Sequence, residues 1–441
     1  MPTSYLPYEP DQDLLLPHSL REWLPQDHLA HYISETVEAL DLRAFYQRYE
    51  DGGPRNQPFH PAMMVKVLVY GYATGVFSSR KIARKLHEDV AFRVLAAGNF
   101  PKHRTICDFR ALHLKELAAL FVQVVKLARE CGLVRLGTIA VDGTKLKANA
   151  SKHKAMSYGR MQTTEAELKA QIDALLARAA QADQAEENEP ELDIPAELAR
   201  REQRLAVILA AKGRLEQRQR EADAQRGRTP DDQDPGAGDA KRKAGPAFKR
   251  PFGQPHPKTQ DNFTDPDSRI MKSSTGFEQC YNGQTAVDAQ AQIIVAAELT
   301  QCASDAGELP RMLAAVERNA GQAAELALAD AGYRNEAALA QLAQSAPDTE
   351  LIVALGREGK QRVRVDAADL PHTAAMAAKL GTAEGISRYR RRKAIVEPPN
   401  AWIKQVLGFR QFSLRGVEKV RCEFKLVCAA LNLRRMATMR L

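Results

Sequence analysis

The chain has 441 residues, 44% of them hydrophobic, and a formal net charge of +8. This length allows two or three domains with substantial cores, and the composition is typical of a globular protein. No apolar run approaches the ~20 residues of a membrane span, and the first residues lack the pattern of a signal peptide, so we expect a cytoplasmic protein without membrane contact. The six cysteines have no zinc-binding spacing, which favours buried thiols in a reducing compartment.

The first 132 residues are predicted to form a helical domain. Apolar residues at helical spacing predict helices over 28–39 and 62–72. Thr105 followed by Asp108 predicts the start of a further helix, which we expect to continue to Gly132. Its apolar face must pack against another element of the chain.

A short basic helix is predicted after Ser78, which is placed to act as its N-cap. The pattern directs Ile82, Leu86 and Val90 inward and leaves the basic residues outside. The outward basic residues are Arg80, Lys81, Arg84 and Lys85. A basic helix after a turn is typical of a DNA-recognition helix, and equally of a bundle helix with a solvated face.

The segment LGTIAVDGTKLKANA, residues 136–150, contains the first candidate for a functional carboxylate. Its apolar run predicts a buried strand that ends at Asp142, where Gly143 and Thr144 are expected to break it. A single Asp before Gly is common turn chemistry, so this residue alone indicates little.

Two further acidic residues strengthen that candidate. A second apolar run ends at Asp330, and Glu397 begins a basic helical segment, EPPNAWIKQVLGFRQF. Two acids at strand ends and a third on a helix are what a two-metal phosphoryl-transfer site requires, because such carboxylates bridge divalent cations ~4 Å apart. Local structure explains two rival acids without catalysis: Asp288 in a hairpin turn and Asp305 as a helix N-cap.

Positive charge is concentrated near the C-terminus. From Glu384 onward, 14 lysines and arginines stand against 4 acidic residues. Such a cluster favours a polyanionic partner, because nucleic acid releases counterions when basic side chains bind it. A solvated basic face is the alternative on charge alone.

Several sequence blocks together resemble the DDE transposases of bacterial insertion sequences. They are VDGTKLKANAS, YNGQTAVDAQAQIIVA, LADAGYRNE and YRRRKAIVEPPNAWIKQVLGFRQFSLRG. The earlier block HPAMMVKVLVYGYATGVFSSRKIARKLHED is similar to the insertion-sequence eleven-eighty-two group. The resemblance implies that Asp142, Asp330 and Glu397 are the catalytic acids and hold two Mg²⁺ or Mn²⁺ ions.

The resemblance also implies residues that contact DNA. Lys404 follows Glu397 at the seven-residue offset of the family signature, and residues seven apart share a helix face. Tyr389 matches the same signature, whereas Arg392 and Lys393 both compete for the position of its basic residue. With Arg80 and Arg84 these are the expected DNA-binding residues. Asp265, Asp267 and Arg269 resemble a family block, DPDSR, and are additional candidates for the site.

The fold class that we expect is α/β, with an RNase H-like mixed sheet. Strands are predicted over 281–287, 293–299, 325–330 and 349–355, with helices over 305–319 and 335–344. We assign residues 133–159 and 265–441 to this catalytic domain. Residues 160–264 are then an insertion between its first two strands, predicted as a helical hairpin and a disordered basic linker. An exposed spacer without chemistry is the preferred interpretation of the hairpin.

The function expected from these features is an enzyme. It would be a transposase that binds terminal inverted repeats, cleaves the 3′ ends and joins them to target DNA, as a homodimer or higher oligomer on double-stranded DNA. Its localisation would be bacterial cytoplasm, with the nucleoid when DNA-bound. The alternatives are a non-catalytic DNA-binding regulator derived from a transposase, and an RNase H-like nuclease that cuts without joining.

Overall fold

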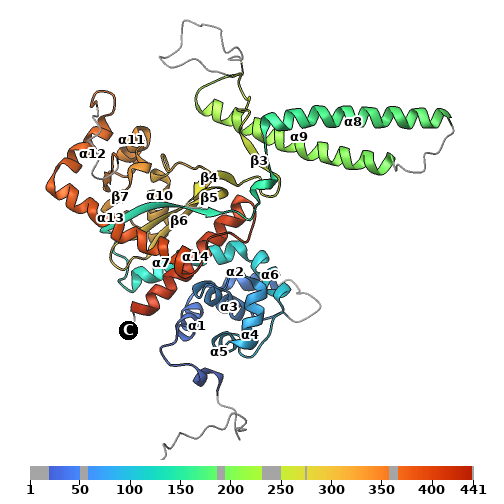
Figure 1. Cartoon of the computed structure of the whole chain (residues 1–441). Helices are drawn as coiled ribbons and strands as arrows, with labels where there is room; N and C mark the ends of the chain where they lie inside the picture. The colour runs from blue at the N-terminus through green and yellow to red at the C-terminus, as the bar shows by residue number, and fades with distance from the viewer. Residues whose placement is uncertain are drawn as a thin grey trace, which may run out of the picture.

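The computed structural model describes residues 19–49, 58–185, 194–230, 250–273, 276–356 and 366–439. Figure 1 shows a bundle of N-terminal helices, a sheet with helices on its faces, and a long helical hairpin that projects from the rest. The architecture is therefore mixed α/β with a helical N-terminal region, as predicted. Within these ranges, no helix is long and apolar enough to cross a membrane.

The main sheet has six strands in the described part of the chain. They are β1 (Thr138–Lys147), β4 (Arg269–Ser273), β5 (Gly276–Asp288), β6 (Ile294–Thr300), β7 (Leu326–Ala329) and β8 (Glu350–Val353). β5, β1, β7 and β8 are neighbours in that order, and β4 and β6 both pair with the other edge of β5. β1, β7 and β8 are parallel, whereas β5 is antiparallel to β1. The predicted β5–β6 hairpin is confirmed.

The first strand is longer than predicted. Gly143 and Thr144 do not break β1, which continues to Lys147. The reason is tertiary, because Gly143 and Thr144 lie opposite Gln284 and Gly283 in the antiparallel ladder with β5. Pairing with the parallel neighbour β7 does end early, at Val141 and Ala329.

Short helices form the N-terminal bundle. They are α1 (Leu29–Ala39), α2 (Arg43–Tyr46), α3 (Pro61–Ala73), α4 (Ser79–Glu88), α5 (Val90–Leu95), α6 (His103–Leu112) and α7 (Leu114–Glu130), with 3₁₀ turns at Leu20–Trp23 and Gln47–Tyr49. The prediction of a single helix from Thr105 to Gly132 is wrong. The structure has two helices there, α6 and α7, which begin at His103 and are separated by His113. The His113 ring is buried 4.5 Å from the Phe109 ring in a non-helical backbone conformation, so side-chain packing explains the break. Val90 is 36% exposed, not inward.

The C-terminal half supplies the helices that cover the sheet. They are α10 (Leu309–Ala320), α11 (Glu336–Ser345), α12 (Pro371–Gly381), α13 (Ala383–Ala401), a π-helical turn η5 (Trp402–Val406) and α14 (Val417–Met439), with a 3₁₀ turn at Ala331–Tyr333. α14 packs between β6 and the N-terminal helices α3 and α7. One hydrophobic cluster therefore runs from the bundle into the sheet. At its centre Phe424 lies so close to Gly283 that a Cβ there would be 2.8 Å from the ring.

The insertion contains the predicted hairpin of two long helices, α8 (Tyr158–Ala185) and α9 (Ile194–Gln225), which lie side by side in Figure 1. Its base is a two-stranded sheet of β2 (Ala155–Ser157) and β3 (Gln260–Asn262), beside a 3₁₀ turn at Lys152–Lys154. A small hydrophobic cluster, which includes Met161 and Leu215, fills the helix interface. The linker predicted as disordered lies partly outside the described residues, but 250–264 is folded against this base, so that part of the prediction is wrong.

Candidate active site

Asp142 and Asp330 lie where the parallel pairing of the central strands β1 and β7 ends. Val141 pairs with Ala329 in parallel register, so the next residue on each strand is one of the two acids. Asp142 accepts a hydrogen bond from the N–H of Gly143 (2.9 Å), and Asp330 accepts one from the N–H of Gly332 (2.8 Å). Burial raises the pKa of Asp142 to about 6; Arg392 opposes the shift, while the charges of Asp330 and Asp305 add to it. Carboxylates that are drawn together and partly desolvated are typical of functional sites.

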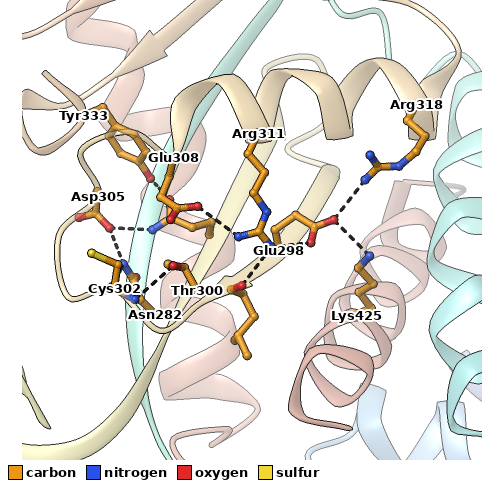
Figure 2. A network of polar contacts seen from close by, with 12 residues as sticks. Asn282, Glu298, Thr300, Cys302, Asp305, Glu308, Arg311, Arg318, Tyr333 and Lys425 are labelled. Atoms are coloured by element: carbon orange, nitrogen blue, oxygen red, sulfur yellow. Dashed lines mark hydrogen bonds and ion pairs between the residues drawn. The ribbon is translucent and has the colours of Figure 1, made fainter. Parts of the chain in front are cut away.

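Asp305 is the acidic residue that the sequence did not assign to this site. It is not a helix N-cap, because α10 begins at Leu309 and Asp305 lies in the loop before it. Its Oδ1 accepts hydrogen bonds from the amides of Asn282 (2.7 Å) and Gln284 (2.7 Å) and lies 3.3 Å from Nζ of Lys145. Figure 2 shows this carboxylate beside Asn282 and Tyr333. The signal in the sequence was the pair of amide residues, Asn282 and Gln284, two positions apart on the strand β5.

Two glycines lie against the carboxylates of Asp305 and Asp330. A Cβ on Gly332 would lie 2.9 Å from Oδ1 of Asp330 and 3.4 Å from Oδ2 of Asp305. A Cβ on Gly143 would collide with Oδ1 of Asp305 and lie 2.7 Å from Nε2 of Gln284. Real Cβ atoms tolerate neither approach without movement of the surrounding atoms. The glycines therefore keep a small polar space open between Asp305 and Asp330.

α13 brings a buried cation to the same place. Arg392 is only 7% exposed, and its Nη1 lies 4.0 Å from Oδ2 of Asp142. Within the described residues its Nε and Nη1 have no hydrogen-bond partner. Burial lowers the pKa of Arg392, but Tyr389, Asp142 and Asp330 outweigh that effect and raise it overall. Of the two competing basic residues, Arg392 is the one in the site, whereas Lys393 is exposed.

Lys404 lies close to the site but not on a regular α-helix. α13 ends at Ala401, and a π-helical turn follows, in which the N–H of Leu407 donates to the carbonyl of Trp402. Pro398 and Pro399, which have no backbone N–H, lie in the last turn of α13 just before it. The prediction that Glu397 and Lys404 share one face of a single helix is therefore wrong. Burial lowers the pKa of half-buried Lys404, and the charge of Asp142 opposes that shift.

Glu397 does not begin a helix, contrary to the prediction, but lies near the end of α13. α13 packs against β1, β5 and β7, and its buried residues include Arg392, Val396 and Asn400. Asn400 accepts a hydrogen bond from Thr285, which pairs with Asp142 across the sheet. Glu397 is on the exposed side of the helix. The fold thus brings Asp142 and Asp330 together and leaves Glu397 at the open side of α13.

Asp265 and Asp267 hold the beginning of α14. Asp267 accepts a hydrogen bond from the N–H of Val417 (3.0 Å). Buried Asp265 accepts one from the N–H of Gly416 (3.2 Å) and one from the Tyr281 hydroxyl, which lies within 3.0 Å of both of its oxygens. Arg269 donates to two carbonyls of the same loop, those of Pro266 and Ser268. Capping of a helix N-terminus accounts for both acids, because its first N–H groups have no partners within the helix.

Arg80 and Arg84 are exposed on α4, as predicted, while Ile82 and Leu86 face inward. Ser78 is the N-cap residue but makes no side-chain capping bond. The turn before α4 is anchored near the candidate site: a Cβ on Gly75 would lie 2.6 Å from the carbonyl oxygen of Leu407, and the rings of Phe77 and Phe409 are 5.0 Å apart. The turn that precedes the basic helix α4 therefore packs against the segment that follows Lys404.

The chemistry of the cluster suits a divalent cation. Carboxylate oxygens are the ligands that Mg²⁺ and Mn²⁺ prefer, and the space beside Gly332 lies between two of them. In the part of the chain that the structure describes, no three His, Cys, Asp or Glu side chains already form a metal-ligand set. The residues therefore fit such an ion by donor type rather than by a preformed coordination shell.

Comparison with known protein families gives two matches. Residues 18–112 match a transposase domain (DUF772), and residues 356–437 match a transposase DDE domain. The first includes Arg80 and Arg84, and the second includes Tyr389, Arg392, Glu397 and Lys404. No curated protein and no solved structure matches the chain. The two matches support an insertion-sequence DDE transposase, an enzyme type that acts on DNA and generally uses divalent metal ions; the particular group of elements is not distinguished.

Proposed function

We propose that this chain is the transposase of a bacterial insertion sequence, related to the eleven-eighty-two group, which binds the terminal inverted repeats of its element, cleaves the 3′ ends and transfers them to target DNA. The observation that carries the proposal is the register of β1 and β7. It places Asp142 beside Asp330, with Arg392 4.0 Å from Asp142, in a chain with transposase-domain matches on both sides.

An RNase H-like fold is part of this proposal. Omitting the short strand β4, the strands follow the order β6, β5, β1, β7, β8, and the last three are parallel. In the RNase H-like fold the first and fourth strands are neighbours and each presents a catalytic acid. The pairing of β1 with β7 supports that assignment, because these are the first and fourth strands of the main sheet in chain order when the edge strand β4 is set aside.

Asp142, Asp330 and Glu397 are the proposed ligands of two Mg²⁺ or Mn²⁺ ions. When bound, such ions activate an attacking oxygen and stabilise the leaving one. Arg392 has buried N–H groups free to donate to a phosphate oxygen beside Asp142, and Lys404 supplies a second positive charge. Charge-assisted bonds of this kind position the scissile phosphate. Glu397, five residues after Arg392 on the exposed side of α13, would approach from the side where DNA enters.

The proposed DNA-binding surface includes α4 and α13. Arg80 and Arg84 are exposed on α4 and would read the inverted repeats in a groove. Tyr389, Lys393 and Lys404 would contact the backbone near the cleaved end. Two ends must be paired before joining, so we propose that a homodimer or a higher oligomer assembles on double-stranded DNA.

Cleavage of a duplex that carries the inverted repeat of the element tests the proposal. Asp142→Asn, Asp330→Asn and Glu397→Gln should each abolish 3′-end cleavage in Mg²⁺ or Mn²⁺ while leaving DNA binding largely intact, because each removes a carboxylate and not the basic surface. Cleavage by one variant within about tenfold of wild type, a barrier change of only ~1.4 kcal/mol, would reject that residue. If the wild type binds this DNA without cleaving it, the result favours a non-catalytic DNA-binding regulator. If it cleaves the DNA without joining the ends to a target, the result favours an RNase H-like nuclease.

A further inference from the structure

We propose that Asp305 is a further metal-binding carboxylate of this site, acting with Asp330 across the space beside Gly332. The inference rests on the proposed function and adds a residue that lies outside both domain matches. Asp305 comes from the loop between β6 and α10, so the site would draw acids from this loop as well as from β1, the end of β7 and α13.

The two oxygens of Asp305 have different surroundings. Oδ1 is held by Asn282, Gln284 and Lys145. Oδ2 faces the other way, 3.4 Å from the place that a Cβ would take on Gly332, and Oδ1 of Asp330 is 2.9 Å from the same point. One oxygen is thus fixed by the protein while the other is presented toward a second carboxylate. Two carboxylates oriented toward one space repel each other unless a cation or a proton lies between them.

Neighbouring residues fix the orientation of this carboxylate. The hydroxyl of buried Tyr333 donates to Oε1 of Gln284, so the amide nitrogen of Gln284 is turned toward Asp305. Asn282 divides its amide N–H groups between Asp305 and the carbonyl of Cys302. Figure 2 shows Asn282, Tyr333 and Cys302 around Asp305. Outer residues that orient a ligand in this way are typical of metal sites.

Two buried polar side chains with atoms that are unpaired in the described part of the chain are a second, independent observation that supports a ligand at this site. Asn282 is fully buried, and within the described residues its Oδ1 has no hydrogen-bond partner. Arg392, also more than nine-tenths buried, aims Nη1 at Asp142 from 4.0 Å, too far for a hydrogen bond, and that atom has no other partner in the described chain. Buried polar groups are almost always satisfied in native proteins. A cation between the acids and an anionic oxygen beside Arg392 would complete the site.

A purely structural role is the competing explanation, because Asp305 ties its loop to β5. Asp305→Asn separates the two roles, since Asn keeps an oxygen acceptor for the two amides but loses the charge. Glu308→Gln is the matched control: it removes the same charge from the same loop, and Glu308 pairs with Arg311 instead of the cluster. Gly332→Ala is a second test, because its methyl group would occupy the space between Asp305 and Asp330.

The experiment is a titration of the full-length, metal-stripped protein with Mn²⁺, in which electron paramagnetic resonance measures free Mn²⁺. Asp305→Asn and Gly332→Ala should each weaken binding tenfold or more, and Glu308→Gln less than twofold, with unfolding temperatures in EDTA close to wild type. If Asp305→Asn and Gly332→Ala bind Mn²⁺ as tightly as wild type, while Asp142→Asn and Asp330→Asn lose Mn²⁺ binding, the role of Asp305 is overturned. The proposed function is not affected by that result. Normal Mn²⁺ binding and normal DNA cleavage in Asp142→Asn and Asp330→Asn, as well as in Asp305→Asn and Gly332→Ala, would instead overturn the proposed function.

Discussion

The raised pKa of Asp142 predicts that this acid destabilises the metal-free protein. Its pKa rises from 3.8 to about 6 on folding, chiefly because of burial. The folded chain then binds more protons than the unfolded chain between these pH values, so the free energy of unfolding falls as the pH rises through the interval. Each pKa unit corresponds to 1.36 kcal/mol, so the full effect is ~3 kcal/mol above pH 7. The side chain is only 25% exposed, which limits screening by solvent.

Asp142→Asn should therefore be more stable than wild type in EDTA. The expected gain is ~3 kcal/mol at pH 8 and roughly half of that at pH 5, where the folded carboxyl is mostly protonated already. Urea denaturation followed by circular dichroism at the two pH values measures it. Glu397→Gln removes one negative charge from the exposed side of α13 and is the control; it should show no comparable gain. A variant no more stable than wild type at pH 8 would refute the reasoning.

Three other predictions concern regions outside the acid cluster. Arg80→Ala or Arg84→Ala should weaken inverted-repeat binding by ~1–3 kcal/mol for each base that the arginine reads, and unchanged affinity in a footprinting titration would reduce α4 to a bundle helix. Joining Gly159 to Pro257, which are hydrogen-bonded at the base of the hairpin, through a short linker should preserve folding and cleavage; a folded variant without nicking would place the hairpin in the reaction. Asp267→Ala should lower stability by ~1 kcal/mol through loss of the α14 cap, without altering Mn²⁺ binding.

Much of the fold was predictable because burial leaves a periodic pattern in the sequence. Apolar runs correctly indicated β5 to β8, and helical spacing indicated α1, α3 and the α8–α9 hairpin. The errors arose where tertiary contacts override local preference. Asp-Gly-Thr favours a turn in an isolated chain, yet in β1 these residues are held by the ladder with β5. Packing of the His113 ring likewise divides a helix that spacing alone makes continuous.

Two acids of the candidate site were predictable because each follows an apolar run in the sequence. Asp142 and Asp330 follow adjacent parallel segments, so the order of strands sufficed to bring them together. Asp305 could not be found in this way, because its place depends on the fold of the loop before α10 and on side chains of β5. For Asp265 and Asp267 a motif suggested chemistry, and the structure gives both side chains hydrogen bonds at the N-terminus of α14, which the motif did not indicate. The π-helical turn at Lys404 gave no signal beyond two prolines.

The side chains of the proposed site differ in exposure: Arg392 is buried, the acids Asp142, Asp305 and Asp330 are half-buried, and Glu397 is exposed. Asp142, Asp330, Asp305 and Arg392 are positioned by sheet and core contacts, so their arrangement precedes any contact with DNA. Glu397 lies at the exposed end of α13, next to a π-helical turn, where the backbone is held by fewer regular hydrogen bonds. A DNA phosphodiester would have to approach the acids from the exposed side of α13, where Glu397 lies. Under the proposed function, docking of a DNA end through Lys404 and the neighbouring basic residues would bring Glu397 over Asp142 and Asp330.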